Sequence, residues 1–262
     1  MSRQAQRIIS NEELFAGLKE LMWRAGDAIL EVYNSEDLGM EAKGDDSPVT
    51  KADLAAHHVL VAGLAQLTPD IPVVSEEDSD SIAVGRTADV YWLIDPLDGT
   101  KEFIKRNGEF TCNLALIENK LSTLGFVGVP AASELYVGGK ELPSTRESRT
   151  SAPQQILHSG QPGVTRVVAS KSHLNDETRS FIDGIKGEVQ LVQAGSSLKF
   201  LKIAVGEADI YPRLAPTCEW DTAAAHAVLD GAGGEVRQAN GDRMIYGKNA
   251  ILNPYFIAKA IV

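Results

Sequence analysis

The sequence VYWLIDPLDGT at residues 90–100 joins a short apolar run to a turn with two carboxylates. The run predicts a buried strand, because it is brief and rich in β-branched and aromatic residues. In the turn, Pro96 holds φ at about −65° and Gly99 permits a positive φ. The chain can therefore fold Asp95 and Asp98 toward one point.

Acidic residues also lie at the ends of two other predicted strands. Glu76 follows a strand expected over 71–75, and Asp221 opens a helix after a strand expected over 208–211. Crowded carboxylates require counter-charge, and oxygen ligands without a nearby cysteine or ligand-spaced histidine favour Mg²⁺ or Mn²⁺ over zinc. Two such ions, about 3.5 to 4 Å apart, can hold the attacking and leaving oxygens of a phosphate ester. A single acidic residue on a loop is more often exposed to solvent than bound to a metal ion, and Asp221 could merely cap its helix.

Two amphipathic helices are predicted before this stretch. Ser10-x-x-Glu13 is a capping box, and the apolar residues that follow it at spacings of three and four predict a helix over 14–32. A second helix over 51–67 begins after Thr50, which places Asp53 in its first turn.

Strands and helices are expected to alternate through the rest of the chain. The first group of strands is expected at 71–75, 90–94, 111–117, 121–129 and 134–137. The second half alternates strands at 166–169, 189–192 and 208–211 with helices at 177–185, 196–205 and 222–230. This pattern is typical of a layered α/β protein. The polar stretch 138–163 is expected to be an exposed connection between two subdomains, of about 1–150 and 151–262, in a single catalytic unit.

Composition narrows the classes of partner. The 262 residues include 25 Lys and Arg against 36 Asp and Glu, a net charge of −11, which argues against a broad basic face for nucleic acid. A small anionic substrate is still compatible, provided that metal ions supply positive charge. We find neither an apolar run of about 18 residues nor a signal peptide, so we expect no integral membrane segment and a cytoplasmic protein, with peripheral contact at the inner membrane left open. Cys112 and Cys218 are far apart and indicate neither a disulfide framework nor a zinc site.

Two separate motifs resemble the signatures of the inositol monophosphatase superfamily. Residues 92–103, WLIDPLDGTKEF, resemble the first signature, and residues 220–225, WDTAAA, through Gly233-Gly234 resemble the second. Within that superfamily the chain is most similar to the bacterial 3′(2′),5′-bisphosphate nucleotidases of the CysQ type. The motifs that carry this similarity are DSPVT at 46–50, SEED at 75–78, KEFIKRNGEF at 101–110, GSSLKF at 195–200 and YPR at 211–213. Inositol monophosphatases usually carry Asn where Glu102 stands. The resemblance implies an α/β (α+β) fold, the layered αβαβα sandwich of the sugar and inositol phosphatase type.

The same resemblance implies roles for individual residues. The metal ligands would be Glu76, Asp95, the Leu97 carbonyl, Asp98 and Asp221. Asp53 and Thr100 would position and deprotonate the attacking water, as a carboxylate hydrogen-bonded to a hydroxyl can. The substrate would contact Glu76, Leu97, Asp98, Gly99, Thr100 and Asp221, with its phosphate on the amides of Gly99 and Thr100.

The candidates for the rest of the substrate are Ser170, His173, Ser196, Lys199 and Arg213. Each also has a structural interpretation. Ser196 could cap a helix, Lys199 and Arg213 could be ordinary surface charges, and His173 could be a polar loop residue.

The resemblance implies Mg²⁺-dependent removal of the 3′-phosphate from adenosine 3′,5′-bisphosphate. A further implied substrate, in sulfur assimilation, is 3′-phosphoadenylyl sulfate. Each site would hold two or three Mg²⁺ ions, or Mn²⁺ in their place. Inhibition by Li⁺ is expected as well. An inositol monophosphatase, a fructose-1,6-bisphosphatase or an NADP phosphatase would use the same chemistry, and a non-catalytic nucleotide or metal sensor is an alternative of another class. The expected partner is a small phosphorylated nucleotide, with a monomer and a homodimer both left open.

Overall fold

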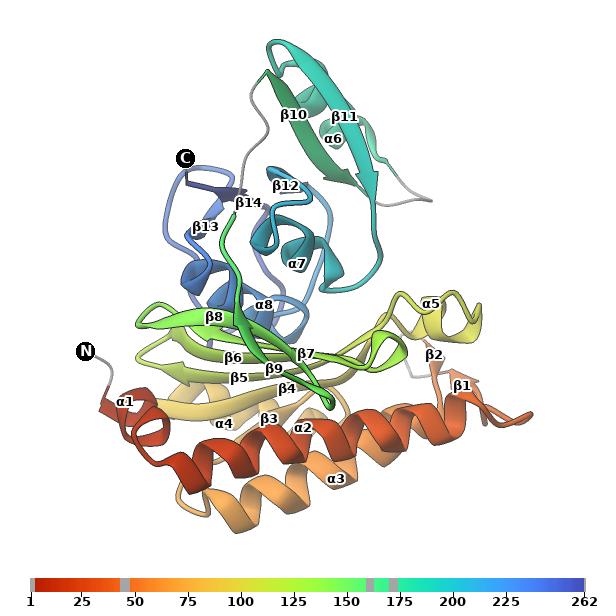
Figure 1. Cartoon of the computed structure of the whole chain (residues 1–262), viewed down its shortest axis with the longest axis vertical. Helices are drawn as coiled ribbons and strands as arrows, with labels where there is room; N and C mark the ends of the chain where they lie inside the picture. Colours follow the sequence, from red (N-terminus) through yellow and green to blue (C-terminus); the bar gives the residue numbers. More distant parts are fainter. Residues whose placement is uncertain (1–2, 43–47, 159–162, 170–173, 262) are drawn as a thin grey trace.

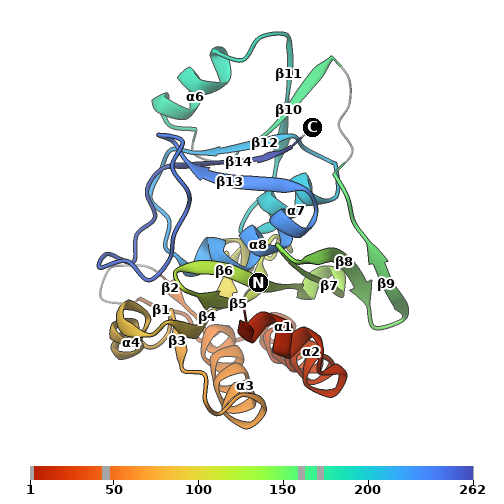
Figure 2. The same cartoon turned by 90° about the vertical axis from the view of Figure 1, so that its left-hand side faces the viewer.

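Two β-sheets and their covering helices form five layers. The computed structural model describes residues 3–42, 48–158, 163–169 and 174–261. Helices α2 and α3 cover one face of the first sheet, and α7 and α8 lie between the two sheets (Figure 1). Helix α6 lies on the outer side of the second sheet (Figure 2). The order is therefore αβαβα, and the predicted fold class is confirmed.

The first sheet is seven-stranded within the described residues, in chain order from β3 to β9. Its strands are β3 (Val73–Ser75), β4 (Val90–Asp98), β5 (Thr111–Glu118), β6 (Leu121–Val129), β7 (Glu134–Gly139), β8 (Leu142–Ser148) and β9 (Ser151–Gln155). β3 pairs with β4 in parallel, and every other neighbouring pair is antiparallel. The apolar run predicted as a strand is buried on both faces: Trp92 and Ile94 pack with α2 and α3, whereas Tyr91 and Leu93 pack toward α7 and α8. Burial of both faces explains why the run is continuously apolar rather than alternating.

The two amphipathic helices are α2 (Glu12–Tyr33) and α3 (Lys51–Leu67). They pack closely, because Gly63 leaves room for Leu21, whose Cδ1 would lie 2.3 Å from a Cβ at that position. The predicted capping box at Ser10 is wrong by one residue. Asn11 is the N-cap, and its side chain accepts a hydrogen bond from the Leu14 amide at 3.1 Å. Ser10 instead ends a short helix, α1 (Arg3–Ile9), where its amide donates to the Gln6 carbonyl.

The second sheet is five-stranded in the described part, in the order β11-β10-β12-β14-β13. Its strands are β10 (Val164–Ala169), β11 (Glu188–Gln193), β12 (Ile210–Arg213), β13 (Gly234–Gln238) and β14 (Phe256–Ala260), and its helices are α6 (Asp176–Asp183), α7 (Leu198–Ala204) and α8 (Trp220–Gly231). The remaining elements are β1 (Glu41–Ala42), β2 (Pro48–Val49), α4 (Ile82–Thr87), α5 (Thr100–Ile104) and two short 3₁₀ turns, η1 (Ser79–Ser81) and η2 (Pro130–Ala132).

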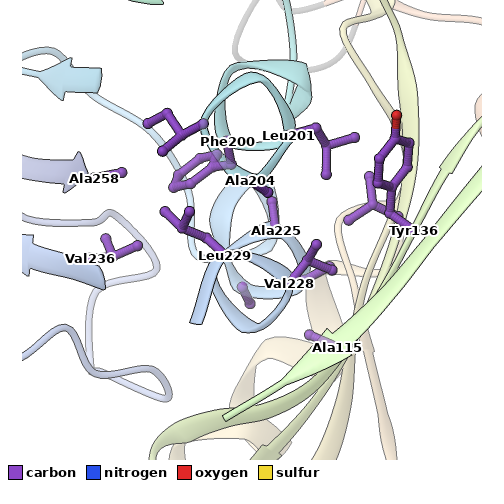
Figure 3. Packing of buried hydrophobic residues seen from close by; sticks show 14 of the residues in the cluster. Ala115, Tyr136, Phe200, Leu201, Ala204, Ala225, Val228, Leu229, Val236 and Ala258 are labelled. Atoms are coloured by element: carbon purple, nitrogen blue, oxygen red, sulfur yellow. The ribbon is translucent and has the colours of Figure 1, made fainter. Parts of the chain in front are cut away.

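Helix α8 is the central element between the two sheets. Figure 3 shows Val228 on the side of Ala115 in the first sheet, while Leu229 points toward Val236 and Ala258 of the second. The helix backbone lies directly on β6, because a Cβ at Gly125 would come within 2.1 Å of the carbonyl oxygen of Ala224. Small residues on both surfaces thus permit the close approach that fixes the start of α8.

The stretch 138–163 differs from its expected role as an exposed connection. Within it, residues 142–148 and 151–155 form β8 and β9, which add two strands to the first sheet, whereas residues 159–162 lie outside the described residues. Lys19 on α2 forms a 2.6 Å salt bridge with Glu147, and Arg149 pairs with Asp27. β9 is exposed along its whole length, and an edge strand of this kind needs no apolar face, so its composition resembled that of a loop.

Cys112 is buried and Cys218 half-buried, and neither forms a disulfide within the described residues. None of the helices in the described ranges is long and apolar enough to cross a membrane.

Candidate active site

The acidic turn is part of β4, although the sequence predicted that the strand ends at Ile94. Asp95 pairs with Asn113 and Asp98 with Thr111, so β4 has one residue more than β5 over this interval. Such a bulge bends a strand and redirects its side chains. Gly99 then adopts φ 92°, the positive value expected for it.

Three carboxylates from different elements converge beside this bulge. Glu76 follows β3, Asp95 lies in β4, and Asp221 lies in the first turn of α8. One oxygen from each lies within 4.8 Å of the others. β3 and β4 are parallel neighbours whose carboxyl ends lie at the same edge, and the packing of α8 on the sheet brings the third acid to that edge. Tertiary structure therefore joins acids that are separated by up to 145 residues (221 − 76) in the sequence.

The electrostatics of this group call for a cation. Burial, then the charges of Glu76, Asp98 and Asp221, raise the pKa of Asp95 well above its usual range. Burial and the charge of Asp98 raise the pKa of Asp221 to about 8, although the Cys218 amide donates to its carboxylate at 2.8 Å and opposes the rise. Asp95 is buried and Glu76 and Asp221 are half-buried. A set of such oxygen donors, whose ionised forms repel one another, fits a hard divalent cation. Glu76, Asp95 and Asp221 are the residues that could hold it.

Asp98 lies beside this group, and its side chain is held by the second half of the chain. Its Oδ2 accepts the amide and hydroxyl of Ser197 at 2.6 and 2.9 Å and the hydroxyl of Ser196 at 2.7 Å. Ser196 adopts φ 50°, which is uncommon for a residue other than glycine. The chain is thus turned sharply so that two consecutive serines reach one carboxylate oxygen.

Asp53 and Thr100 form a second polar cluster at the same edge. Thr50 caps α3, so the helix starts where the sequence predicted. The amide and hydroxyl of Thr50 donate to Asp53 Oδ2 at 2.7 and 2.6 Å. The Thr100 hydroxyl lies 3.2 Å from Asp53 Oδ1 and 3.3 Å from the Leu97 carbonyl oxygen. Burial raises the pKa of Asp53, against the opposing hydrogen bonds from Thr50. A buried carboxylate paired with a hydroxyl is an arrangement suited to accepting a proton.

A cavity of about 390 Å³ opens next to Asp98 and Asp221. Its lining includes six predicted substrate contacts, which are Asp98, Gly99, Ser196, Lys199, Arg213 and Asp221. The other lining residues are Glu102, Gly195, Phe200, Tyr211, Ala215, Pro216, Thr217 and Thr222. Carboxylates and two cations therefore line the same open cavity.

Neither cation is an ordinary surface charge. Lys199 is only 8% exposed, and its ammonium donates to the Ser196 carbonyl at 2.9 Å and lies 5.6 Å from the centre of the Tyr211 ring. Arg213 donates through Nη2 to the Pro216 carbonyl at 2.7 Å. Its buried Nε has no hydrogen-bond partner among the described residues. An unpaired buried donor beside the cavity is suited to an anion.

Two predicted substrate contacts, Ser170 and His173, lie outside the described residues. Ser197, Thr111 and Asn113 were not predicted, although Ser197 stands in the same Gly-Ser-Ser motif as Ser196. His57 was assigned no role, and its Nδ1 lies 2.8 Å from the Ser75 hydroxyl, next to Glu76.

Comparison with known proteins gives the family. Residues 10–260 match the model of the inositol monophosphatase family. The chain belongs to this family.

A 3′(2′),5′-bisphosphate nucleotidase CysQ from Salmonella typhimurium is 45% identical over 239 residues, which cover 90% of this chain and 96% of that protein. The CysQ nucleotidase of Buchnera aphidicola is 38% identical over 246 residues and 92% of each chain. The crystal structure of CysQ from Bacteroides thetaiotaomicron superposes with a TM-score of 0.83 at 39% identity, covering 95% of this chain and 97% of that one. The predicted subgroup is confirmed.

Proposed function

We propose that this chain is a Mg²⁺-dependent phosphatase that hydrolyses the 3′-phosphate of adenosine 3′,5′-bisphosphate to AMP and phosphate. The proposal extends to 3′-phosphoadenylyl sulfate. The observation that carries it is the convergence of Glu76, Asp95 and Asp221 next to the hydrogen-bonded pair of Asp53 and Thr100. The nucleotidase names of relatives at 38 to 45% identity support the nucleotide substrate.

The metal would be held by Glu76, Asp95, Asp98, Asp221 and the Leu97 carbonyl. When bound, divalent ions lower the pKa of water and offset the negative charge of the phosphate. Mg²⁺ is favoured because the donors are oxygen atoms, although Mn²⁺ accepts the same ligands.

Asp53 and Thr100 would carry the proton transfer. Thr100 directs its hydroxyl hydrogen to Asp53 Oδ1 and keeps a lone pair for a proton of the attacking water. That water then attacks phosphorus in line with the departing 3′-oxygen, while the proton passes through Thr100 to Asp53. The raised pKa of Asp53, caused first by burial, makes its carboxylate a better proton acceptor. The reaction requires no phosphoenzyme.

The cavity would bind the rest of the nucleotide. Lys199 and Arg213 supply positive charge for a second phosphate, and the unpaired Nε of Arg213 supports that assignment. We propose Ser196, and from the family resemblance Ser170 and His173, as further contacts. The transferred phosphate would rest on the amides of Gly99 and Thr100.

We propose that residues 1–262 form a single catalytic unit. Two subdomains of about 1–150 and 151–262 would act together, because Asp221 from the second completes the acidic group of the first.

Phosphate release from four esters tests the substrate. Adenosine 3′,5′-bisphosphate, inositol 1-phosphate, fructose 1,6-bisphosphate and NADP are compared at equal concentration with Mg²⁺. We expect at least a tenfold preference for the bisphosphate nucleotide, which is about 1.4 kcal/mol of transition-state discrimination.

Each of the other results excludes part of the proposal. Preference for another of the four esters would retain the metal site and replace the substrate. Nucleotide binding without phosphate release from any ester would point to the sensor alternative.

Lithium provides a separate prediction. We expect millimolar Li⁺ to inhibit phosphate release at fixed Mg²⁺, as the nucleotidase resemblance implies. The measurement is a dose–response curve for LiCl, with NaCl and KCl at equal ionic strength as controls. Equal rates in the three salts would contradict the assignment to this subgroup.

A further inference from the structure

Ser197 lies where three elements of the candidate active site meet. The residue is 1% exposed. Its hydroxyl oxygen lies 2.9 Å from Asp98 Oδ2 on β4, 2.8 Å from the Asp221 carbonyl oxygen on α8 and 3.0 Å from Asn113 Nδ2 on β5. We propose that Ser197 is a positioning residue that holds Asp98 Oδ2 and leaves Oδ1 for a divalent cation. This inference rests on the proposed metal-dependent function.

The single hydrogen of this hydroxyl is best assigned to Asp98. Asn113 Nδ2 is a donor, so the Ser197 oxygen accepts from it. The two acceptors that compete for the hydroxyl hydrogen are a carboxylate and the carbonyl of Asp221. A carbonyl in the first turn of a helix already accepts an amide four residues later, whereas an ionised carboxylate makes the stronger hydrogen bond.

Three donors lie within 2.9 Å of Asp98 Oδ2. They are the Ser197 amide, the Ser197 hydroxyl and the Ser196 hydroxyl, and together they hold this oxygen in one direction. Oδ1 receives no hydrogen bond within the described part of the chain. The serines therefore fix the carboxylate plane and leave one oxygen for coordination, in the way that outer partners orient metal ligands.

Isothermal titration of the metal-free protein with Mg²⁺ tests this role directly. We expect Ser197→Ala to weaken Mg²⁺ binding about tenfold, within the range known for partners of metal ligands. In the assay, Ser197→Ala should need about tenfold more Mg²⁺ for half-maximal rate. Its KM for the nucleotide at saturating Mg²⁺ should stay within about twofold of wild type.

Ser122→Ala is the matched control. Ser122 is 7% exposed and its hydroxyl donates to the Ala223 carbonyl at 2.7 Å, so this variant also loses a buried hydrogen bond to the first turn of α8. It does not touch Asp98. We expect wild-type Mg²⁺ affinity in Ser122→Ala, with a loss of thermal stability comparable to that of Ser197→Ala.

Ser197→Cys keeps nearly the volume of the side chain and replaces a strong donor by a weak one, so it serves if the alanine variant does not fold. We expect its Mg²⁺ affinity to lie below that of wild type. Wild-type affinity in the folded Ser197 variants, or an equal loss in Ser122→Ala, would overturn the positioning role alone. Absence of Mg²⁺ binding to the wild-type protein would instead overturn the proposed metal-dependent function together with it.

Discussion

At the scale of single residues, the proposed proton transfer depends on one hydroxyl. Thr100 lies between Asp53 Oδ1 and the Leu97 carbonyl, at 3.2 and 3.3 Å. Thr100→Val keeps the shape of the side chain and removes the hydroxyl. We expect kcat to fall about 10²- to 10⁴-fold, the usual contribution of a positioned proton-transfer group, while Mg²⁺ affinity is unchanged.

Thr100→Ser is the control for that experiment, because it restores a hydroxyl at the same atom. Steady-state kinetics and Mg²⁺ titration of both variants give the comparison. If Thr100→Val retained wild-type kcat, the proposed proton path through this residue would be wrong.

At the scale of elements, the start of α3 serves both stability and chemistry. The Thr50 side chain caps the helix through the Ala52 amide and also donates to Asp53. Thr50→Ala should cost about 1 kcal/mol of unfolding free energy. Because the Thr50 hydrogen bond lowers the pKa of Asp53, its loss should raise that pKa and move the acidic limb of the pH–rate profile to higher pH.

Asn11→Ala provides a cap deletion away from the site. Asn11 caps α2 through the Leu14 amide, so its replacement should cost a similar free energy in urea denaturation and leave the pH–rate profile unchanged. A shift of the profile in both variants would attribute it to general destabilisation rather than to Asp53.

At the scale of the whole molecule, the carboxyl groups of Asp95 and Asp221 should make the free energy of unfolding depend on both pH and metal binding. Burial and neighbouring carboxylates raise the pKa of Asp95 and Asp221 above the ordinary value of 3.8, to about 8 for Asp221. Between these values the native metal-free protein binds more protons than the unfolded chain, so its unfolding free energy should fall as pH rises from about 4 to 8.

Added Mg²⁺ should reverse that trend, because it favours the ionised carboxylates and binds only the native state. Urea denaturation at several pH values, with and without Mg²⁺, measures both slopes. Calorimetry in buffers of different ionisation enthalpy should also detect protons released on Mg²⁺ binding. The same pH dependence in both conditions would contradict a metal site at Asp95 and Asp221.

The main helices, most strands and the candidate acids could be predicted from the sequence, because their signals are local. Thr50 and Asp53 are three residues apart and form their cap within one turn, and the apolar run at 90–94 predicts its own burial. The edge strand β9 could not be predicted, because its exposed side chains carry no apolar pattern. The Ser197 amide donates to Asp98 across 99 residues of chain, and the Lys199 ammonium lies 5.6 Å from the centre of the Tyr211 ring on β12. Contacts of that kind have no local periodicity, so the packing of α8 and the two sheets decides which side chains complete the site.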